Sequence, residues 1–288
     1  MSLDTPGACD SHVHVFLPEQ FAYDPQRSYT PGPANCGALN RHMGLLGLQR
    51  CVIVQPSVYG TDNACLLAGL KTMGPAARGV AVVDPATVTD AQLQDLQAAG
   101  VRALRVNFEA GGGSPADKPA AIAAMASRLR GTDLAIQLYV DIQTAATAVR
   151  LPAMQDVVLI LDHYAGFKVG TDLASADFQS ILDALRGGNI WVKLSAPYRT
   201  GCSSPDYSEL QPVAEAMIEA APQRMVWASD WPHTGGGKDR GGHNHPQIEP
   251  FRQIDSAVDL ERLRSWVADP AGFAAIISDN PARLFDFS

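Results

Sequence analysis

The sequence predicts a (β/α)8 TIM barrel, formed by a single domain that spans residues 1–288. Three observations support this prediction. Eight apolar, β-branched runs recur along the chain, helix-like segments separate most of them, and polar residues stand where several of the runs end. Soluble domains usually hold about 100–200 residues, but an α/β barrel reaches roughly 250 residues in one domain. A chain of 288 residues therefore fits one barrel.

The expected strands are short runs of mainly apolar residues. Strands with so few polar residues are buried on both faces, as in a parallel sheet. They cover residues 8–16, 50–55, 79–84, 101–108, 134–141, 157–163, 190–195 and 225–230.

The expected helices show apolar residues at helical spacing. Strands that alternate with helices form βαβ units, and eight such units favour closure into a barrel. A doubly wound open sheet is the alternative, although no Gly-x-Gly-x-x-Gly turn follows the first strand. The helices are expected at residues 44–49, 62–71, 90–99, 120–130, 177–186, 209–221, 260–268 and 279–285.

Three irregular stretches follow expected strands: residues 18–37, 111–115 and 233–250. Barrel enzymes build their active sites from loops at the carboxyl ends of strands, so these stretches are expected at the mouth. The last one contains His243 and His245 in a glycine-rich context. We interpret that pair as part of a lid or solvated loop rather than as a metal site.

Composition excludes several classes of partner. The net charge of −8 argues against binding to nucleic acid or to an anionic membrane. The chain has no apolar stretch near the ~20 residues of a membrane span, and its first residues lack the basic segment of a signal peptide.

Five cysteines without a CxxC motif indicate reduced thiols. We expect a cytoplasmic protein, and a homodimer is left open.

The sharpest chemical signal is a set of polar residues at three strand ends. His12 and His14 are two residues apart on the first strand, so both side chains point to the same face. His163 ends the sixth strand, and Asp230 ends the eighth. A carboxylate in such a place is costly to bury without partners. In a barrel, these four side chains converge on one mouth.

Motifs at these positions resemble the amidohydrolase superfamily, in particular the branch of 2-pyrone-4,6-dicarboxylate lactonases, 4-sulfomuconolactone hydrolases and galactarolactone isomerases. They are DSHVHVF at residues 10–16, LDHYAG at 161–166, ASDWPH at 228–233 and DNPARLF at 279–285. The resemblance implies hydrolysis or isomerisation of a small, anionic lactone. It implies Asp230 as the general base, and His12, His14 and His163 as residues that polarise the lactone carbonyl or hold a metal. The implied substrate-binding residues are Tyr29, Ser57, Arg105, Tyr139 and Arg199.

Elementary chemistry agrees with these roles. Opening a lactone requires a base for water and a donor for the developing oxyanion. The planar fork of arginine suits a carboxylate substrate. Arg102 and Arg105 are three residues apart on a strand and should face opposite ways, and we expect Arg105 to face inward. For Arg199, surface charge is the alternative to substrate binding.

A metal is the main open question. Two-metal amidohydrolases carry a carboxylated lysine and a further histidine on the middle strands, but this chain has Arg105 and Tyr139 there. These two residues resemble the metal-free pyrone lactonases, so we expect no cofactor. A single zinc remains the alternative. Its ligands would be His12, His14, His163 and Asp230.

The chain departs from the pyrone-dicarboxylate lactonases in its mouth charges. It lacks the arginines that follow their fourth and sixth strands. Lys168 can replace one of these charges, and Glu109 would repel a dianion. A monocarboxylate or sugar-acid lactone is therefore a competing substrate. We predict a lactone hydrolase, with a lactone isomerase, a zinc-dependent amidohydrolase or decarboxylase, and a non-catalytic binding barrel as alternatives. His42 is expected to be structural, and His233 to line the site or to fix its loop.

Overall fold

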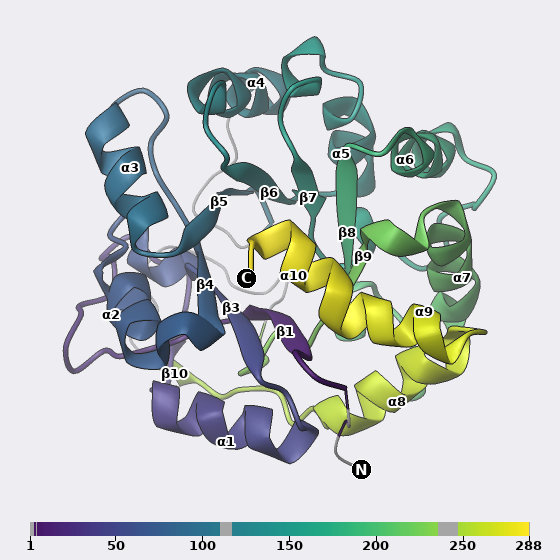
Figure 1. The fold of residues 1–288 in the computed structure, drawn as a ribbon, viewed down its shortest axis with the longest axis horizontal. Coiled ribbons are helices and arrows are strands. Elements are labelled where there is room, and N and C mark those ends of the chain that lie inside the picture. The colour runs from purple at the N-terminus through teal and green to yellow at the C-terminus, as the bar shows by residue number, and fades with distance from the viewer. Residues whose placement is uncertain (1–2, 4, 110–116, 236–246, 288) are drawn as a thin grey trace.

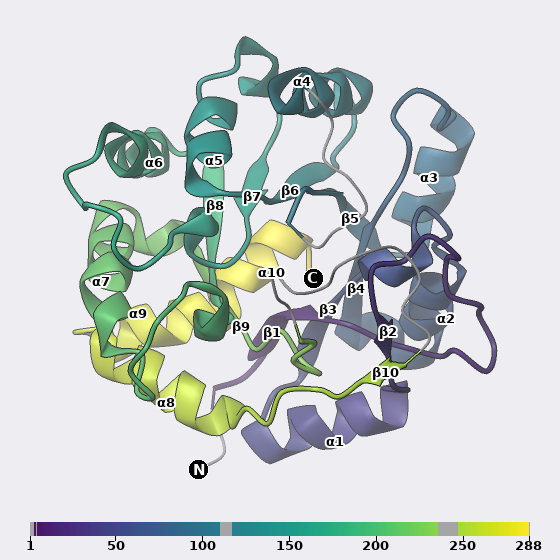
Figure 2. The same ribbon diagram turned by 180° about the vertical axis from the view of Figure 1, so that it is seen from behind.

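The computed structural model describes residues 3, 5–109, 117–235 and 247–287. Its main sheet has eight strands, each parallel to the next, surrounded by helices (Figures 1 and 2). In sheet order the strands are β1 (Cys9–Val13), β3 (Arg50–Val54), β4 (Ala77–Ala81), β5 (Val101–Asn107), β6 (Ala135–Tyr139), β7 (Leu159–Leu161), β8 (Ile190–Ser195) and β9 (Met225–Ala228). All eight predicted strands are present, and the predicted (β/α)8 barrel is confirmed.

The barrel closes beside the predicted catalytic residues. A parallel bridge joins Val13 at the end of β1 to Trp231, three residues beyond β9. The backbone N–H of Asp230 donates to the carbonyl of His12 at 3.0 Å, and that of His14 donates to the carbonyl of Trp231 at 2.8 Å. An open, doubly wound sheet would leave these edge groups unpaired, so that alternative is wrong.

The helices around the barrel agree with the sequence patterns except near the first loop and at two short helices that the patterns did not predict. They are α1 (Cys36–Leu46), α2 (Ala64–Met73), α3 (Asp90–Ala98), α4 (Lys118–Leu129), α5 (Ile142–Ala148), α6 (Ala176–Gly187), α7 (Gln211–Ala220), α8 (Ser256–Trp266), α9 (Pro270–Ala274) and α10 (Asn280–Phe285). The helix expected at residues 44–49 is present with other bounds, because it begins at Cys36 and ends at Leu46. Asn35 caps α1 by accepting from the N–H of Ala38, and Gly47 ends it with a φ of 75°. The N-cap residue Asn35 thus lies inside residues 18–37, which were predicted to be irregular.

Helix α5 has no counterpart among the sequence predictions. It is seven residues long, too short to show a helical repeat, and Ala145, Ala146 and Ala148 are its main buried side chains beside Ile142. Its start is nevertheless encoded locally. The Asp141 side chain accepts from the N–H of Thr144, which satisfies one of the unpaired donors of the first turn.

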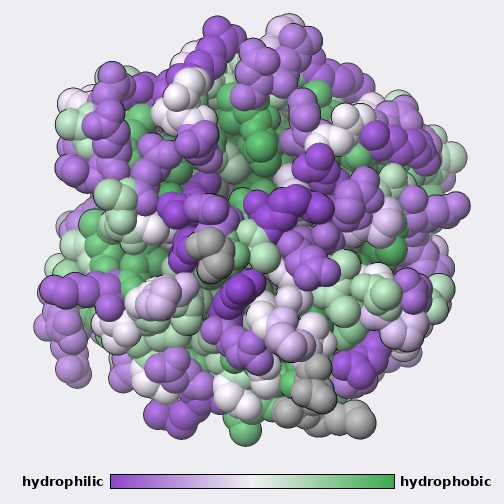
Figure 3. Space-filling view, in the orientation of Figure 1, coloured by the Kyte–Doolittle hydropathy of each residue, from purple (hydrophilic) through white to green (hydrophobic). Residues whose placement is uncertain are grey.

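Helix α10 closes the amino-terminal end of the barrel (Figure 1). Phe285 at its end is fully buried, and it packs with Phe287 against the innermost layer of strand side chains. That layer contains Cys9, Val52, Val54, Val80, Ala103, Ala135, Ile160, Trp191 and Val226. Polar side chains cover most of the face seen at this end (Figure 3). The opposite, carboxyl end of the barrel is the end that α10 leaves uncovered.

Two short strands lie at the side of the carboxyl end, near α1 and α2 (Figure 2). β2 (Thr30–Pro31), after β1, pairs in parallel with β10 (Ile248–Glu249), after β9 (Figure 2). This pair ties together two of the stretches that were predicted to be irregular. The third stretch, together with His243 and His245, lies outside the described residues. Within the described part of the chain, no helix has the length and apolar character that a membrane crossing requires.

Candidate active site

A cavity of about 610 Å³ opens at the carboxyl end of the barrel. Every residue that the sequence predicted for the site lines this cavity, except His12. His12 is fully buried. The predicted residues in the wall are His14, Tyr29, Ser57, Arg105, Tyr139, His163, Arg199 and Asp230.

The four residues predicted to converge do meet. Asp230 Oδ1 lies 3.6 Å from His12 Nε2 and 3.4 Å from His14 Nε2. The two Nε2 atoms are 3.3 Å apart. The rings of His12 and His163 are 5.1 Å apart between centroids. Side chains from β1, from the end of β7 and from the end of β9 thus share one small volume.

Left-handed backbone turns place two of these side chains. His163 has a φ of 51° and Asp230 a φ of 64°, and each follows the last residues of a strand. This conformation is uncommon outside glycine but is enriched for Asp and His. The turn after β7 also explains the glycine of LDHYAG, because a Cβ on Gly166 would lie 2.1 Å from the carbonyl oxygen of Val140.

One oxygen of Asp230 is held firmly, and the other is not. Oδ2 accepts from the Tyr198 hydroxyl at 2.7 Å and from Arg199 Nε at 2.8 Å, and Arg199 Nη2 lies at 2.8 Å. Oδ1 has no hydrogen-bond partner among the described residues. Burial raises the pKa of Asp230, but Arg199 and the histidines outweigh it and hold the pKa well below its usual range. Asp230 is therefore a carboxylate at neutral pH.

A buried polar network lies around His12. Asp162, Gln137 and Lys193 are almost fully buried, and Lys193 Nζ donates to Gln137 Oε1 at 2.7 Å. Gln137 Nε2 in turn donates to Asp162 Oδ2 at 3.0 Å. Arg105 Nη2 lies 3.6 Å from the same oxygen. Burial lowers the pKa of Lys193 to about 8, whereas Asp162 acts to raise it.

Sequence reasoning assigned no role to Asp162, Gln137 or Lys193. A signal existed for Lys193, because a lysine interrupts the otherwise apolar strand IWVKL of residues 190–194. A buried lysine requires partners, which lie on β1, β6 and at the end of β7. These partners are distant in sequence, so only the fold identifies them. Tyr198 was likewise missed, although it directly precedes Arg199.

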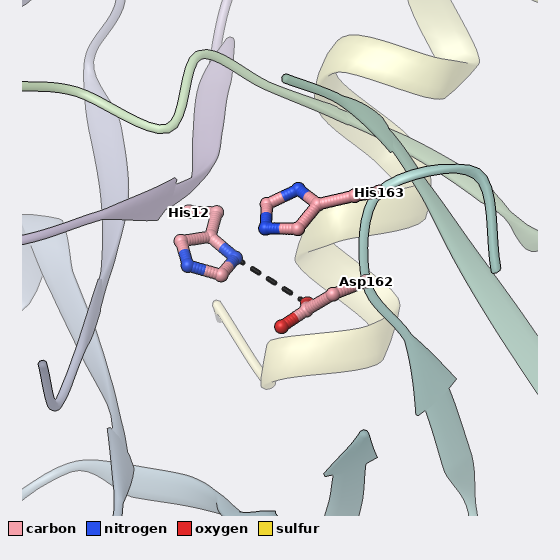
Figure 4. A group of neighbouring side chains, drawn as sticks. All are labelled: His12, Asp162 and His163. Atoms are coloured by element: carbon pink, nitrogen blue, oxygen red, sulfur yellow. Dashed lines mark ion pairs between the residues drawn. The ribbon is translucent and has the colours of Figure 1, made fainter. Parts of the chain in front are cut away.

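His163 contacts the same network. Its ring lies beside that of His12, and below the two rings is the Asp162 carboxylate, which forms an ion-pair contact of 3.3 Å with His12 Nδ1 (Figure 4). His163 Nδ1 lies 2.8 Å from Ser195 Oγ. The Tyr139 ring meets His163 edge to face, with centroids 4.7 Å apart. Burial lowers the pKa of His163 to about 3, so its imidazole is neutral at neutral pH.

Positive side chains dominate the cavity wall. Arg105 is buried and faces inward, whereas Arg102 points outward to Asp286, as predicted. Lys168 lines the cavity and donates to the backbone carbonyl of Arg199 at 2.7 Å. Arg252, which sequence reasoning missed, also lines it, as does Glu109. Four cationic side chains and the two carboxylates of Glu109 and Asp230 thus line the cavity, and the wall suits an anion.

Arg199 is not a plain surface charge. Its side chain is 13% exposed and is bonded to both Asp230 and Thr234. Most of its donors are thus engaged before any substrate arrives. Its first role in this geometry is to hold Asp230 in place.

The four predicted zinc ligands do not form one cluster. They fall into two clusters that share His12, and the second also contains Asp162. One comprises His12, His14 and Asp230, and the other comprises His12, His163 and Asp162. Ligand atoms of a tetrahedral zinc site, bound at 2.0–2.1 Å, are about 3.4 Å apart. The 3.3, 3.4 and 3.6 Å separations within the first group match that spacing. The donor set of the first group therefore fits a single zinc ion.

The two other histidines within the described ranges, His42 and His233, support the walls. His42 lies on α1, contacts Asp10 Oδ2 at 3.3 Å and stacks on Trp231, as expected for a structural residue. His233 is outside the cavity lining. Its Nε2 lies 3.1 Å from Ser256 Oγ, and its backbone N–H donates to the carbonyl of Asp230 at 2.8 Å. His233 was predicted either to line the site or to fix its loop, and these contacts indicate that it fixes the loop.

Ionisable side chains that converge at the carboxyl mouth of a closed β/α barrel are typical of an enzyme active site. The chain belongs to the amidohydrolase family, whose model matches residues 9–287. It is 33% identical to a 2-pyrone-4,6-dicarboxylate hydrolase of Comamonas testosteroni and 30% identical to a 4-sulfomuconolactone hydrolase of Rhizobium radiobacter. Each alignment covers 97% of this chain and 90% of the relative.

A third relative confirms the predicted branch, and a solved structure confirms the fold. A D-galactarolactone isomerase of Agrobacterium fabrum is 27% identical, over 98% of this chain and 92% of the isomerase. An apo crystal structure from Agrobacterium tumefaciens has a TM-score of 0.82 at 25% identity, and the match covers 98% of this chain and 96% of that one.

Proposed function

We propose that this protein is a lactone hydrolase in which Asp230 activates the attacking water. The observation that carries the proposal is the state of the Asp230 carboxylate. It is ionised, its Oδ2 is held by Tyr198 and Arg199, and its Oδ1 meets no donor within hydrogen-bonding geometry among the described residues. Asp230 also lines the anion-compatible cavity. Oδ1 is thus positioned to accept a proton from water.

The reaction requires two further events at the same place. As Oδ1 takes the proton, the water oxygen bonds to the lactone carbonyl carbon, and charge develops on the carbonyl oxygen. Arg105 and His163 line the cavity and can donate to that oxygen. The bond from the carbonyl carbon to the ring oxygen then breaks, and the proton on Asp230 passes to the departing oxygen. The products are a hydroxyl and a carboxylic acid.

We propose that the reaction proceeds without a metal. His12 and His14 can pair with each other through their Nε2 atoms, so the site has a stable arrangement of hydrogen bonds by itself. The zinc alternative rests on the spacing of His12, His14 and Asp230. A zinc ion held by these residues would lower the pKa of bound water and polarise the carbonyl. Metal analysis and the activity after chelation distinguish the metal-free mechanism from the zinc-dependent one.

We propose that the substrate is a small carboxylated lactone. The relative from Comamonas testosteroni is named for a pyrone dicarboxylate, which makes a 2-pyrone-4,6-dicarboxylate-like lactone the first compound to test. The cavity of about 610 Å³ has room for such a ligand. Glu109 in its wall favours a substrate with fewer carboxylates. A panel should therefore include monocarboxylate and sugar-acid lactones.

Isomerisation is the second candidate, because one relative is named a D-galactarolactone isomerase. In that reaction a hydroxyl of the substrate replaces water as the nucleophile, and the same Asp230 can take its proton. Turnover in ¹⁸O-labelled water separates the two: hydrolysis incorporates solvent oxygen into the product, and isomerisation does not.

The decisive experiment is a lactone panel assayed by proton release with metal-stripped protein. We expect turnover of at least one carboxylated lactone without added metal, and no further gain on adding zinc. Turnover only after zinc is added would reject the metal-free mechanism. A failure to turn over any lactone, with or without zinc, would favour the binding-protein alternative.

Replacing Tyr198 by phenylalanine should shift the pH dependence of the reaction. The Tyr198 hydroxyl donates to Asp230 Oδ2, which stabilises the ionised form, so its removal raises the pKa of Asp230. A hydrogen bond to a charged group contributes about 1.5–3 kcal/mol, which corresponds to a rise of about 1–2 pH units. The apparent pKa of the acid limb of the kcat/KM profile should rise by that amount. An unchanged limb would show that Asp230 does not govern it.

A further inference from the structure

Lys193 occupies a position that the proposed reaction does not use directly. It is fully buried within the barrel and is absent from the cavity wall. Its Nζ has three polar neighbours: Gln137 Oε1 at 2.7 Å, His12 Nδ1 at 3.3 Å and Asp162 Oδ1 at 3.6 Å. An ammonium group has three N–H donors, which matches these three acceptors in number. Gln137 is oriented accordingly, because its amide nitrogen is bonded to Asp162.

His12 has two tautomers with opposite consequences, and the network of hydrogen bonds decides between them. If Lys193 donates to Nδ1, the His12 proton lies on Nε2 and can be donated to His14 Nε2 at 3.3 Å. If Nδ1 carries the proton instead, it points to Asp162, and Nε2 presents a lone pair to His14 and Asp230.

His14 limits the choice. Its Nδ1 lies 2.8 Å from the carbonyl oxygen of Val54, an acceptor only, so Nδ1 of His14 must donate. Its neutral ring then presents a lone pair at Nε2. With a proton on Nδ1 of His12 as well, two imidazole lone pairs and Asp230 Oδ1 would face one another within 3.6 Å. Such a group of buried acceptors is unfavourable unless a cation joins them.

The other tautomer removes this conflict. Donors and acceptors then alternate from Lys193 to His12, from His12 to His14 and from His14 to Val54. Two close pairs of acceptors remain. His12 Nδ1 and Asp162 Oδ1 have the Lys193 ammonium beside both atoms, and His14 Nε2, which faces Asp230 Oδ1 at 3.4 Å, receives the proton of His12 Nε2. Asp230 Oδ1 stays outside this chain of hydrogen bonds, with its lone pairs available to water.

We propose that Lys193 is a positioning residue that holds His12 in the Nε2-protonated tautomer and so allows the site to work without a metal. This inference rests on the proposed function for its catalytic consequence, but the tautomer itself can be measured independently. Without Lys193, His12 Nδ1 would be left with Asp162 and should donate to it. The two Nε2 atoms and Asp230 Oδ1 would then form the arrangement that suits zinc.

The test is ¹⁵N NMR of histidine side chains in the intact protein, in parallel with kinetics. The His12 signals are assigned by their absence from a His12→Asn variant. In the wild type we expect His12 protonated at Nε2 and not at Nδ1. In Lys193→Met we expect the reverse, with kcat at least tenfold lower and KM changed less than about threefold. Zinc content after dialysis against zinc should be higher in Lys193→Met than in the wild type.

Trp191→Phe is the matched control. Trp191 lies two residues earlier on β8, in the inner layer near α10, and contacts Arg224 and Arg283 rather than His12. Its substitution should leave the His12 tautomer unchanged. A wild-type His12 protonated at Nδ1 overturns the proposal, even if Lys193→Met does not fold. An unchanged His12 tautomer in folded Lys193→Met also overturns it. A confirmed tautomer without lactone turnover would instead refute the proposed function alone.

Discussion

Asp230→Asn is expected to lower kcat by about 10²–10⁴-fold, the usual contribution of a general base. The amide can still accept from Tyr198 and Arg199 through its oxygen, so the loop geometry should persist. Its nitrogen then replaces Oδ1 and has no lone pair with which to take a proton from water. Because binding of the lactone depends on other groups, KM should change less than about tenfold. Steady-state kinetics at neutral pH measures both parameters.

Asp10→Asn provides the matched control for this substitution. Asp10 is a buried carboxylate on β1, yet it faces Ser229 and His42 instead of lining the cavity. Its replacement perturbs the barrel closure without removing the proposed base, and kcat should stay within about tenfold of the wild-type value. A kcat of Asp230→Asn within threefold of the wild type would exclude Asp230 as the base.

Strand periodicity was sufficient to predict the barrel and the convergence of His12, His14, His163 and Asp230 at its mouth, whereas the substrate-binding residues followed from the family resemblance. Apolar runs identify the strands, and polar residues at their ends identify the carboxyl mouth. The alternation of strand side chains also separated Arg105 from Arg102 correctly. These inferences use only neighbours in the sequence and one topological rule.

The pairs of side chains that contact each other across the barrel could not be predicted from strand periodicity. Arg199 was predicted to bind substrate, but its closest partner is Asp230, which lies 31 residues away. Lys193 pairs with His12, 181 residues earlier in the chain. A strand pattern shows that a buried lysine must have partners, but the identity of those partners depends on how eight strands are staggered around the barrel. The helix at Ile142–Ala148 was missed for a different reason, since seven residues are too few for a helical repeat.

Arg199→Met should destabilise the protein by about 3–5 kcal/mol at neutral pH, the usual cost of removing one partner of a buried ion pair. Asp230 is 1% exposed and Arg199 is 13% exposed, so the pair is largely shielded from solvent. Urea denaturation measures the free energy of unfolding. Arg102→Met is the control, because its partner Asp286 is 71% exposed, and such a pair contributes about 0–1 kcal/mol.

The pH dependence of this loss identifies Asp230 as its source. In the wild type, the pKa of Asp230 is below its unfolded value of about 3.9, so its ionisation stabilises the fold above that pH. This stabilisation is lost as the pH falls through 4 toward the folded-state pKa. In Arg199→Met, burial is no longer opposed by the guanidinium, and the pKa of Asp230 should exceed 3.9. Ionisation then destabilises that variant as the pH rises.

The difference in unfolding free energy between wild type and Arg199→Met should therefore be largest at pH 7 and should narrow as the pH falls toward 4. A difference that is constant across this range would mean that Arg199 stabilises the loop by packing or through Thr234, and not through the charge of Asp230. Because the same charge defines Asp230 as a base that is ionised at neutral pH, the stability measurement tests the electrostatic premise of the mechanism without any substrate.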